Sequence, residues 1–265
     1  MRFTKMQGLG NDYVYLDCTR EIPADLPGLA RRVSDRHFGV GSDGLICICP
    51  SDRADFRMRM YNADGSESEM CGNGIRCVGK FVYDKGLTDQ TQVTVETLAG
   101  IKTLELHVQD GAVRSVTVDM GAPVWEEERV LSIQGREYTV LPVSMGNPHA
   151  VLYVEDTAAL DLPALGPDFE HHPSFPNRTN TEFVEVLGPA HLKMRVWERG
   201  SGETMACGTG ACAVLAASAL TGRSGREADV DLLGGRLHIR WDEKSGHIFM
   251  TGPAVTVFEG ELTEA

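Results

Sequence analysis

Two stretches of the chain repeat each other and decide the fold: MRMYNADGSESEMCGNGIRC at residues 58–77 and MRVWERGSGETMACGTGAC at residues 194–212. Cys71 aligns with Cys207 at an offset of 136 residues, and the glycines of the two Cys-Gly-x-Gly motifs align as well. A period this long indicates two whole domains that arose by duplication, since the repeat units of a solenoid are only about 20 to 50 residues long.

Each half of the chain repeats the same order of predicted elements. Alternating and β-branched segments bounded by Gly, Asp and Pro predict strands, and a helix is predicted after each repeated cysteine, over about 74–85 and 210–220. The second of these helices is apolar nearly all round, which indicates burial inside a curved or closed sheet. We therefore expect an α+β fold of two pseudo-symmetric domains, each a β-barrel-like curved sheet around a central buried helix. The expected domains are 1–115 with a C-terminal strand at about 254–265, and 116–253.

The composition is ordinary for a globular enzyme and excludes several classes of protein. Hydrophobic residues make up 42% of the chain and charged residues 24%, which argues against disordered and collagen-like proteins. The formal charge of −13 repels polyanions, so nucleic acid is not an expected partner. No stretch approaches about 18 consecutive apolar residues, and the N-terminus lacks the apolar core of a secretory signal. We expect a cytoplasmic protein with no membrane association.

The seven cysteines are predicted to be free thiols. Their number is odd, a cytoplasmic compartment is reducing, and no two of them have the two-residue spacing of a zinc ribbon. We expect no metal site, and we interpret five of the cysteines as packing or bystander thiols: Cys18, Cys47, Cys49, Cys77 and Cys212.

Cys71 and Cys207 are the strongest candidates for chemistry. Each lies immediately before a predicted buried helix, where free backbone N–H groups form a site for a carboxylate or phosphate. The same helix dipole stabilises a thiolate, so a cysteine at this position is a usable base near neutral pH. One such motif is equally well explained as a glycine-rich loop with a buried thiol, but two motifs in matching positions favour a functional role for both cysteines.

A duplicated thiol supplies the two acid/base groups that a two-base racemase needs. Inversion of a carbon stereocentre by proton transfer needs a base on one face and an acid on the other. If a pseudo-two-fold axis relates the halves, both helix N-termini face one cleft between the domains, and the developing negative charge is stabilised there by backbone N–H groups. No cofactor is then required. Two facing thiols can also oxidise to a disulfide, so strong thiol oxidation is expected to block activity.

Several polar residues recur in loops where a substrate could be bound. Asn is also an ordinary turn residue, but Asn11 and Asn147 align across the repeat, which favours a substrate-binding role for both. Arg199, beside Glu198, is of the type best suited to hold a carboxylate. His149 close to a thiol would change the ionisation of that thiol.

Five segments together resemble diaminopimelate epimerase and occur in the order of that family along nearly the whole chain: KMQGLGND, YNADGSESEMCGNGIRC, MGNPH, NRTNTEFVEV and ERGSGETMACGTGA. The resemblance implies an isomerase of two α/β domains, each a strand barrel around a central helix. It also implies a homodimeric, pyridoxal-phosphate-independent bacterial enzyme that interconverts LL- and meso-2,6-diaminopimelate, on the route to lysine and cross-linked cell wall.

The resemblance also implies roles for individual residues. Cys71 and Cys207 match the acid/base pair of the family, and His149 and Glu198 match residues that adjust the ionisation of these cysteines. The positions that match backbone donors around the reacting end of the substrate are Gly72, Asn73, Gly208 and Thr209. The positions that match polar residues surrounding the substrate, and holding its far amino acid end, are Asn11, Asn62, Asn147, Asn180, Glu198 and Arg199.

The sequence departs from the family pattern at Gly44. Many members have Gln after the Asp of a GxGxDQ segment, whereas this chain has GVGSDG. We therefore assign no side-chain contact with substrate to residue 44.

Three alternatives remain open. Proline racemase and hydroxyproline epimerase share the fold and the paired cysteines, but their first motif typically has His where this chain has Asn73, and a large polar site would reject proline. The isomerases of phenazine-type biosynthesis share the fold but not the cysteine pair. A binding module that closes on an amino acid without chemistry belongs to a different class, and alanine replacement of each cysteine distinguishes it from an enzyme.

Overall fold

The computed structural model describes residues 1–263, and its internal contacts divide the chain into two units. Unit 1 is Met1–Val118 together with the C-terminal stretch from Gly252, and unit 2 is Asp119–Thr251. Within the described residues, no helix is long and apolar enough to cross a membrane.

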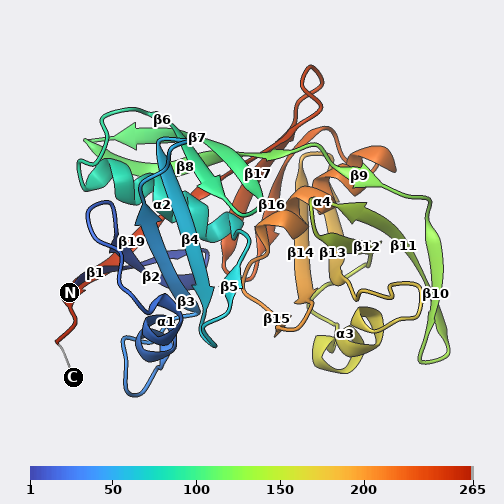
Figure 1. Cartoon of the computed structure of the whole chain (residues 1–265). Helices are drawn as coiled ribbons and strands as arrows, with labels where there is room; N and C mark the ends of the chain where they lie inside the picture. The colour runs from blue at the N-terminus through green and yellow to red at the C-terminus, as the bar shows by residue number, and fades with distance from the viewer. Residues whose placement is uncertain (264–265) are drawn as a thin grey trace. The chain divides into compact units, whose positions relative to one another are not determined.

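Unit 1 is a strongly curved sheet around one helix. β19, β1 and β2 are antiparallel neighbours, β2 and β3 are parallel, β3 and β4 antiparallel, β4 and β6 parallel, and β6 to β8 antiparallel. Helix α2 (Gly72–Asp84) packs inside against β1, β2 and β7, as Figure 1 shows. The strands are β1 (Arg2–Gly8), β2 (Asn11–Asp17), β3 (Gly44–Cys49), β4 (Phe56–Asn62), β5 (Glu67–Ser68), β6 (Gln92–Thr97), β7 (Gly100–Gln109), β8 (Ala112–Gly121) and β19 (Val255–Glu261).

Unit 2 repeats this arrangement around helix α4 (Gly208–Leu220), which packs against β11, β12, β13, β16 and β17. The parallel and antiparallel pairings follow the same order as in unit 1, with β10 and β9 beside β11. The strands are β9 (Val124–Trp125), β10 (Arg129–Ile133), β11 (Arg136–Ser144), β12 (Pro148–Tyr153), β13 (Asn180–Gly188), β14 (His191–Glu198), β15 (Gly202–Glu203), β16 (Glu227–Leu232), β17 (Gly235–Trp241) and β18 (Ile248–Pro253).

The strand register of the two units is the same at the offset of 136 residues. Tyr13 pairs with Gly44 between the parallel strands β2 and β3, and His149 pairs with Asn180 between β12 and β13. In the next pair, Ile46 faces Met60, and Glu182 faces Val196. Residues at this offset therefore occupy equivalent places in the two units.

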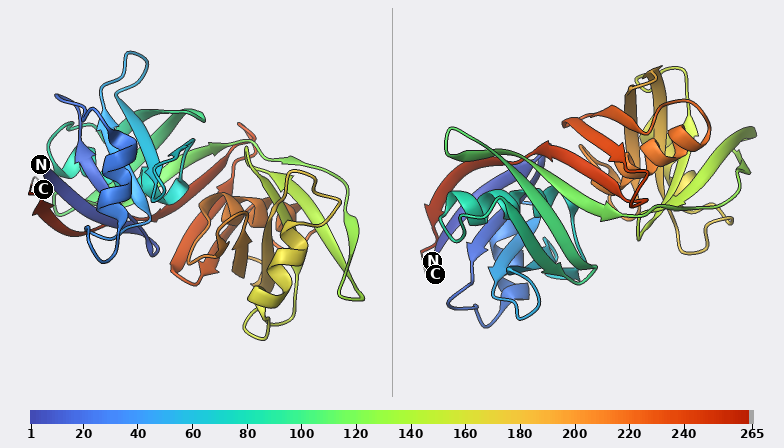
Figure 2. Two further views of the ribbon diagram at one scale, coloured as in Figure 1. Left: turned by 60° about the horizontal axis from the view of Figure 1, so that its bottom comes forward. Right: turned by 90° about the horizontal axis from the view of Figure 1, so that it is seen from above.

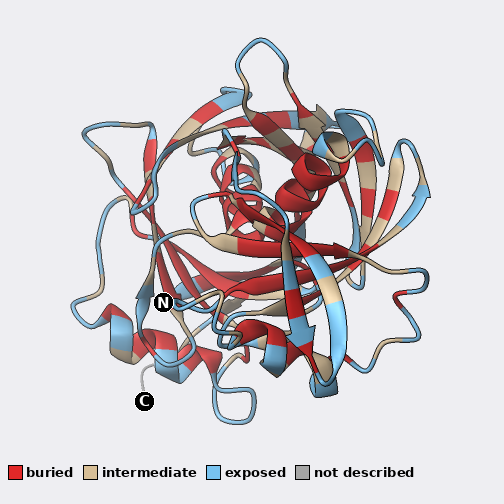
Figure 3. Ribbon diagram, turned by 90° about the vertical axis from the view of Figure 1, so that its right-hand side faces the viewer, coloured by how far each residue is buried: buried red, intermediate tan, exposed pale blue. Residues whose placement is uncertain are grey.

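The two central helices explain why each unit closes around its helix. Ten of the thirteen residues of each helix are buried, which leaves no polar face to expose to solvent. Figure 3 shows one such helix in red within a ring of strands. Both helices begin two residues earlier than the sequence patterns predicted, because each cysteine is itself the N-cap and the glycine after it is already helical. Both are followed by a glycine with φ of 69°, Gly86 and Gly222, in the left-handed conformation that ends a helix.

A second helix lies on the outside of each sheet. Helix α1 (Leu26–Ser34) packs on β2, β3 and β4, and helix α3 (Leu162–Glu170) packs on β13 and β14. Both are visible in the left view of Figure 2. Each begins at an aspartate, Asp25 or Asp161, whose carboxylate accepts a hydrogen bond from an N–H of the first turn.

Candidate active site

In unit 1, the candidate site is built at the N-terminus of α2. Cys71 is the N-cap, and its half-buried sulfur accepts a hydrogen bond from the N–H of Gly74 at 3.4 Å. The thiol also lies 3.1 Å from Oδ1 of Asn11, the first residue of β2. Tyr13 lies beside it, and burial together with the nearby Cys71 raises the pKa of the Tyr13 phenol well above its ordinary value. Cys71 therefore has a neutral, hydrogen-bonding environment on these sides.

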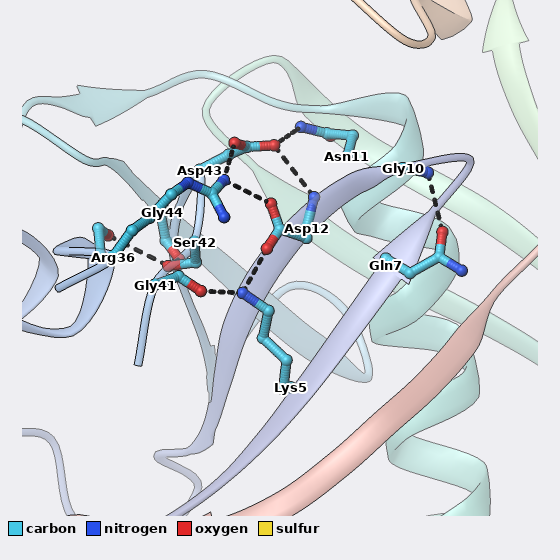
Figure 4. Close-up of polar contacts among 11 residues, drawn as sticks. Lys5, Gln7, Gly10, Asn11, Asp12, Arg36, Gly41, Ser42, Asp43 and Gly44 are labelled. Atoms are coloured by element: carbon cyan, nitrogen blue, oxygen red, sulfur yellow. Dashed lines mark hydrogen bonds and ion pairs between the residues drawn. The ribbon is translucent and has the colours of Figure 1, made fainter. Parts of the chain in front are cut away.

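Asn11 is held in place by an ion-pair network, shown in Figure 4. Its Nδ2 donates to Oδ2 of Asp43 at 2.8 Å, and the same oxygen accepts from the backbone N–H of Asp12 at 3.1 Å. Arg36 bonds to both aspartates at 3.0 Å, and Lys5 forms an ion pair with Asp12. Burial opposes ionisation of Asp12, but the hydrogen bonds from Lys5 and Arg36 outweigh it and lower the pKa of that carboxyl. The network fixes the direction in which the Asn11 amide points.

The other predicted residues of unit 1 occupy two places. Gly72 and Asn73 are the first two residues of α2, next to Cys71. Oδ1 of Asn73 accepts from Arg76 at 3.0 Å. Asn62 ends β4, and its Nδ2 donates to Oγ of Ser66 at 3.0 Å across the β4–β5 turn.

In unit 2, the equivalent site has a different electrostatic character. Cys207 is the N-cap of α4 and only 5% exposed, and its sulfur lies 3.5 Å from Oγ1 of Thr209. Burial, and then the nearby carboxylates of Glu198 and Glu182, raise the pKa of the Cys207 thiol well above its ordinary value. Burial likewise raises the pKa of Glu198, against a hydrogen bond from Thr204. Cys207 is therefore held as a neutral thiol.

A ring nitrogen of His149 lies within 4.8 Å of this sulfur, and the ring contacts two further side chains. Its Nδ1 lies 2.6 Å from Oε1 of Glu182, and its Nε2 lies 3.1 Å from Oδ1 of Asn147. Asn147 also donates from Nδ2 to Oγ1 of Thr209 at 3.2 Å. Two ligands of one tetrahedral zinc ion would lie about 3.4 Å apart. The 2.6 Å separation of His149 and Glu182 is thus that of a hydrogen-bonded pair.

Asn180 and Arg199 form a separate pair at the ends of β13 and β14. The amide of Asn180 donates to the carbonyl of Pro148 at 2.9 Å and accepts from the backbone N–H of Arg199 at 2.9 Å. The Arg199 side chain is exposed, and its guanidinium donates to the carbonyl of Asn177 at 3.2 Å. In this structure Arg199 is thus on the surface of unit 2, free to meet an anionic group from solvent.

Comparison with known proteins decides the family. The sequence model described as diaminopimelate epimerase matches residues 3–126 and 141–257. A diaminopimelate epimerase of Acetivibrio thermocellus is 58% identical over 99% of this chain and 98% of its own length, and one of Methanococcus maripaludis is 56% identical over 99% of both. The chain belongs to the diaminopimelate epimerase family.

Solved structures with lower identity share the fold. A phenazine biosynthesis protein of the PhzF family from Bacillus anthracis has a TM-score of 0.77 at 20% identity and covers 100% of this chain and 99% of its own. A hydroxyproline epimerase from Agrobacterium vitis has a TM-score of 0.73 at 18% identity and covers 99% of this chain and 90% of its own. The expected α+β fold of two similar halves, each with a curved sheet around a buried helix, is confirmed.

The departure from the diaminopimelate epimerase pattern at Gly44 has a steric reason. A Cβ added at Gly44 would lie 2.1 Å from the carbonyl oxygen of Tyr61 and 2.8 Å from Cε1 of Tyr13. Both neighbours are buried, and the first is backbone, so neither moves away easily. No side chain fits at this position without a shift of β3 or β4.

We therefore expect Gly44→Ala to lower the free energy of unfolding by about 2 to 3 kcal/mol, because overpacking forces strain on the strands around it. Chemical denaturation followed by circular dichroism measures this. Gly188→Ala is the control, since Gly188 ends β13 outside the left-handed region and no atom lies within 4 Å of its added Cβ. A Gly44→Ala protein as stable as the unsubstituted chain would contradict the steric explanation.

Glu182 is the residue of this diaminopimelate epimerase site that sequence reasoning missed. It lies in the quoted segment NRTNTEFVEV, but a lone Glu in a strand is usually exposed, and here it is completely buried. The available signal was the internal repeat, because Glu182 aligns with Ile46, a core position of unit 1. When one repeat has a charged residue at the position where the other repeat has a core isoleucine, the charged residue indicates a function of its own repeat alone.

The remaining cysteines are placed as packing residues. Cys18, Cys47 and Cys49 are part of the hydrophobic core of unit 1. A hydrogen bond with Cys47 raises the pKa of Cys18 to about 12, and burial raises the pKa of Cys77 to about 11. These two thiols are therefore protonated at neutral pH.

Proposed function

We propose that this chain is an isomerase that epimerises LL-2,6-diaminopimelate to meso-2,6-diaminopimelate by two-base thiol chemistry, in the formation of lysine and of peptidoglycan precursors. The observation that carries the proposal is the pair of cysteine N-caps, Cys71 and Cys207, at equivalent helix N-termini of a chain 58% identical to a diaminopimelate epimerase. No cofactor is part of the proposed reaction.

In the proposed mechanism, one cysteine acts as thiolate and removes the α-proton, and the other donates its thiol proton to the opposite face of the same carbon. Inversion requires the two groups to reach one carbon from opposite sides. The carbanion intermediate places its charge on the neighbouring carboxylate, which the N–H groups at the helix N-termini, including those of Gly72, Asn73, Gly208 and Thr209, are suited to bind. Reversal of the direction exchanges the roles of the two cysteines.

The polar side chains around the two helix N-termini support a zwitterionic substrate. We propose that the far amino acid end of diaminopimelate is held by Asn11, Asn62, Asn147, Asn180, Glu198 and Arg199. Amide groups supply both donors and acceptors, and Arg199 supplies a cation for a carboxylate. His149 and Glu198 are proposed to control the ionisation of Cys207, whose pKa responds to carboxylates in its surroundings.

Of the further properties proposed, the homodimer rests on the family resemblance alone. We propose a cytoplasmic enzyme that acts as a homodimer on a small-molecule substrate. We also propose that the two units are functional domains, each contributing one of the reacting thiols.

Proton NMR in deuterium oxide tests the proposal. The reduced protein is incubated with LL-diaminopimelate, without added cofactor, and in parallel with L-proline. We expect deuterium to enter the α position of diaminopimelate and the meso isomer to appear, with proline unchanged. Exchange of proline alone would assign the chain to the activity of its hydroxyproline epimerase-like structural relatives. Exchange of neither would favour a binding module.

A further inference from the structure

The turn between β14 and β15 carries Arg199 on the surface of unit 2. A hydrogen bond from the N–H of Ser201 to the carbonyl of Glu198, at 3.1 Å, closes this turn. Gly200, at its third position, has φ of 78°, which is typical of a type II turn. Turns of types I and II differ in the direction of the peptide between Arg199 and Gly200. A hydrogen-bond partner of that peptide therefore fixes the conformation at Arg199.

Glu170, the last residue of α3, is such a partner. Its Oε1 accepts a hydrogen bond from the N–H of Gly200 at 2.9 Å, and its Oε2 accepts from Nε1 of Trp197 at 2.8 Å. The Glu170 side chain is only 6% exposed. Burial opposes its ionisation, but the hydrogen bonds from Trp197 and Gly200 help to outweigh burial and lower the pKa of the carboxyl. Both oxygens of a buried, ionised carboxylate thus hold residues at and beside the turn.

The indole of Trp197 lies against α3 because Gly166 leaves room for it. A Cβ added at Gly166 would lie 2.1 Å from Cδ2 of Trp197. Gly166 precedes Glu170 by four residues, so both lie on one face of α3. Helix α3 also packs on β14 and on β15, the strand that follows the turn (Figure 1). The turn is therefore attached to α3 through the residues on both of its sides.

Glu170 also reaches the side chain of Arg199 through the loop before β13. The guanidinium of Arg199 donates to the carbonyl of Asn177 at 3.2 Å. The next residue, Arg178, forms an ion pair with Oε1 of Glu170 at 3.4 Å. One carboxylate therefore holds both the backbone of the turn and the loop that orients the Arg199 guanidinium.

Unit 1 has the same turn with different residues at the positions that hold it. The residues at the offset of 136, in unit 2 and unit 1 respectively, are Arg199 and Ala63, Glu170 and Ser34, and Asn180 and Gly44. An acid at the C-terminal end of a helix is electrostatically unfavourable, because the helix dipole places negative charge there. The carboxylate at the end of α3 therefore indicates a role in holding the turn that carries Arg199, since it is at an unfavourable place for α3 itself.

Glu198 is held independently of Glu170. It pairs with Gly202 between β14 and β15, and its carboxylate accepts a hydrogen bond from Thr204. Loss of the Glu170 carboxylate is thus expected to loosen the turn at Arg199 and to leave Glu198 in place.

We propose that Glu170 is a positioning residue, which fixes the turn so that the guanidinium of Arg199 is presented to a carboxylate at the far end of the substrate. The inference rests on the proposed function in that Arg199 holds that end. The far end is remote from the proton transfer and is bound equally in the ground state and the transition state. Glu170 is therefore expected to act on KM rather than on kcat.

Glu170→Gln tests this role with little change in volume. The amide nitrogen of Gln is a donor and cannot accept a hydrogen bond from Trp197 or Gly200. We expect KM for LL-diaminopimelate to rise at least about 10-fold and kcat to stay within about 3-fold of the original value. In an Arg199→Ala protein, the same substitution is expected to change KM less than about 2-fold, because two residues that act through one contact are not additive.

Glu185→Gln is the matched control. Glu185 is a second carboxylate of unit 2, and it accepts hydrogen bonds from the N–H and hydroxyl of Thr157 and from Lys193. It lies five residues along β13 from Asn180. We expect KM and kcat of this variant to stay within about 2-fold of the original values. Circular dichroism verifies that each variant folds.

Hydrogen exchange followed by mass spectrometry measures the turn without any reaction. In Glu170→Gln, the amides of residues 199–201 are expected to exchange at least about 10-fold faster, whereas those of the equivalent turn of unit 1, residues 63–65, are expected to be unchanged. Trp197→Phe removes the indole donor to Oε2 and keeps an aromatic ring. This milder variant is expected to raise both the exchange rate and KM by about 3-fold.

The outcomes separate this inference from the proposed function. Additive effects of Glu170→Gln and Arg199→Ala on KM, or exchange at 199–201 that Glu170→Gln leaves unchanged, would overturn the role of Glu170. Failure of the proposed function has a different signature, since the unsubstituted protein would then show no turnover of diaminopimelate while Glu170→Gln still accelerates exchange at the turn. That result would overturn the role in substrate binding and support the contact between Glu170 and the turn.

Discussion

Replacement of Cys71 or Cys207 by alanine is expected to lower kcat for diaminopimelate epimerisation at least about 1,000-fold in both directions. Each proton transfer needs its own positioned group, and a general acid or base typically contributes about 10² to 10⁴ in rate. Because the reaction inverts one carbon, neither thiol can replace the other. The measurement is the appearance of the second isomer by NMR, starting from each isomer in turn.

Cys212→Ala is the matched control for this loss. Cys212 lies within α4, five residues after the N-cap Cys207, and is completely buried. The Cys212→Ala variant is expected to retain most of the activity. The dissociation constant for diaminopimelate of the two catalytic variants, measured by calorimetry, is expected to stay within about 10-fold of the value for the unsubstituted protein. Epimerisation that survives either substitution at Cys71 or Cys207 would rule out the two-base reaction.

Arg76→Met is expected to lower the free energy of unfolding by at least about 3 kcal/mol. Arg76 is completely buried in α2, and its guanidinium donates to the carbonyls of Gly72 and Pro253 at 3.2 Å and to Oδ1 of Asn73 at 3.0 Å. Methionine fills a comparable volume but leaves these acceptors without their donor inside the protein. Urea denaturation followed by circular dichroism gives the change.

The equivalent position of unit 2 provides the comparison, since Cys212 aligns with Arg76. Cys212→Ala removes one buried sulfur atom and is expected to cost about 1 kcal/mol. If Arg76→Met and Cys212→Ala destabilise the protein equally, the hydrogen bonds of Arg76 do not hold the start of α2 as argued. A lower activity of Arg76→Met at full stability would instead indicate that Arg76 acts on Asn73 and Gly72 directly.

The fold could be predicted from the sequence because the chain contains two copies of the same domain pattern. The repeat around Cys71 and Cys207 fixed equivalent strands and helices, and the apolar composition of the segment after Cys207 required a buried helix. Helix starts were displaced by two residues, because Cys-Gly-x-Gly reads as a loop until the cysteine is recognised as an N-cap. Spacing alone cannot distinguish a glycine that begins a helix from one that precedes it.

The candidate site was only partly within reach of the sequence. The cysteines, the paired asparagines and His149 follow from the repeat and from family motifs. That Asp43 orients Asn11, that Glu182 binds His149 and that Arg199 is exposed depend on strands brought together in the sheet. The two pairs are separated by 32 and 33 residues along the chain, and no local pattern specifies which side chains face each other across strands.

The amino-acid sequence by itself determined the duplication, the two helix-terminal thiols and the family, because these depend on residue identity and order. Only the tertiary structure decided how the two thiols differ. Cys71 has a hydrogen bond from the N–H of Gly74 and an asparagine beside it, and Cys207 is buried among Glu198, Glu182 and His149. The free energy of a charge depends on burial and on the distance to other charges, and folding sets both.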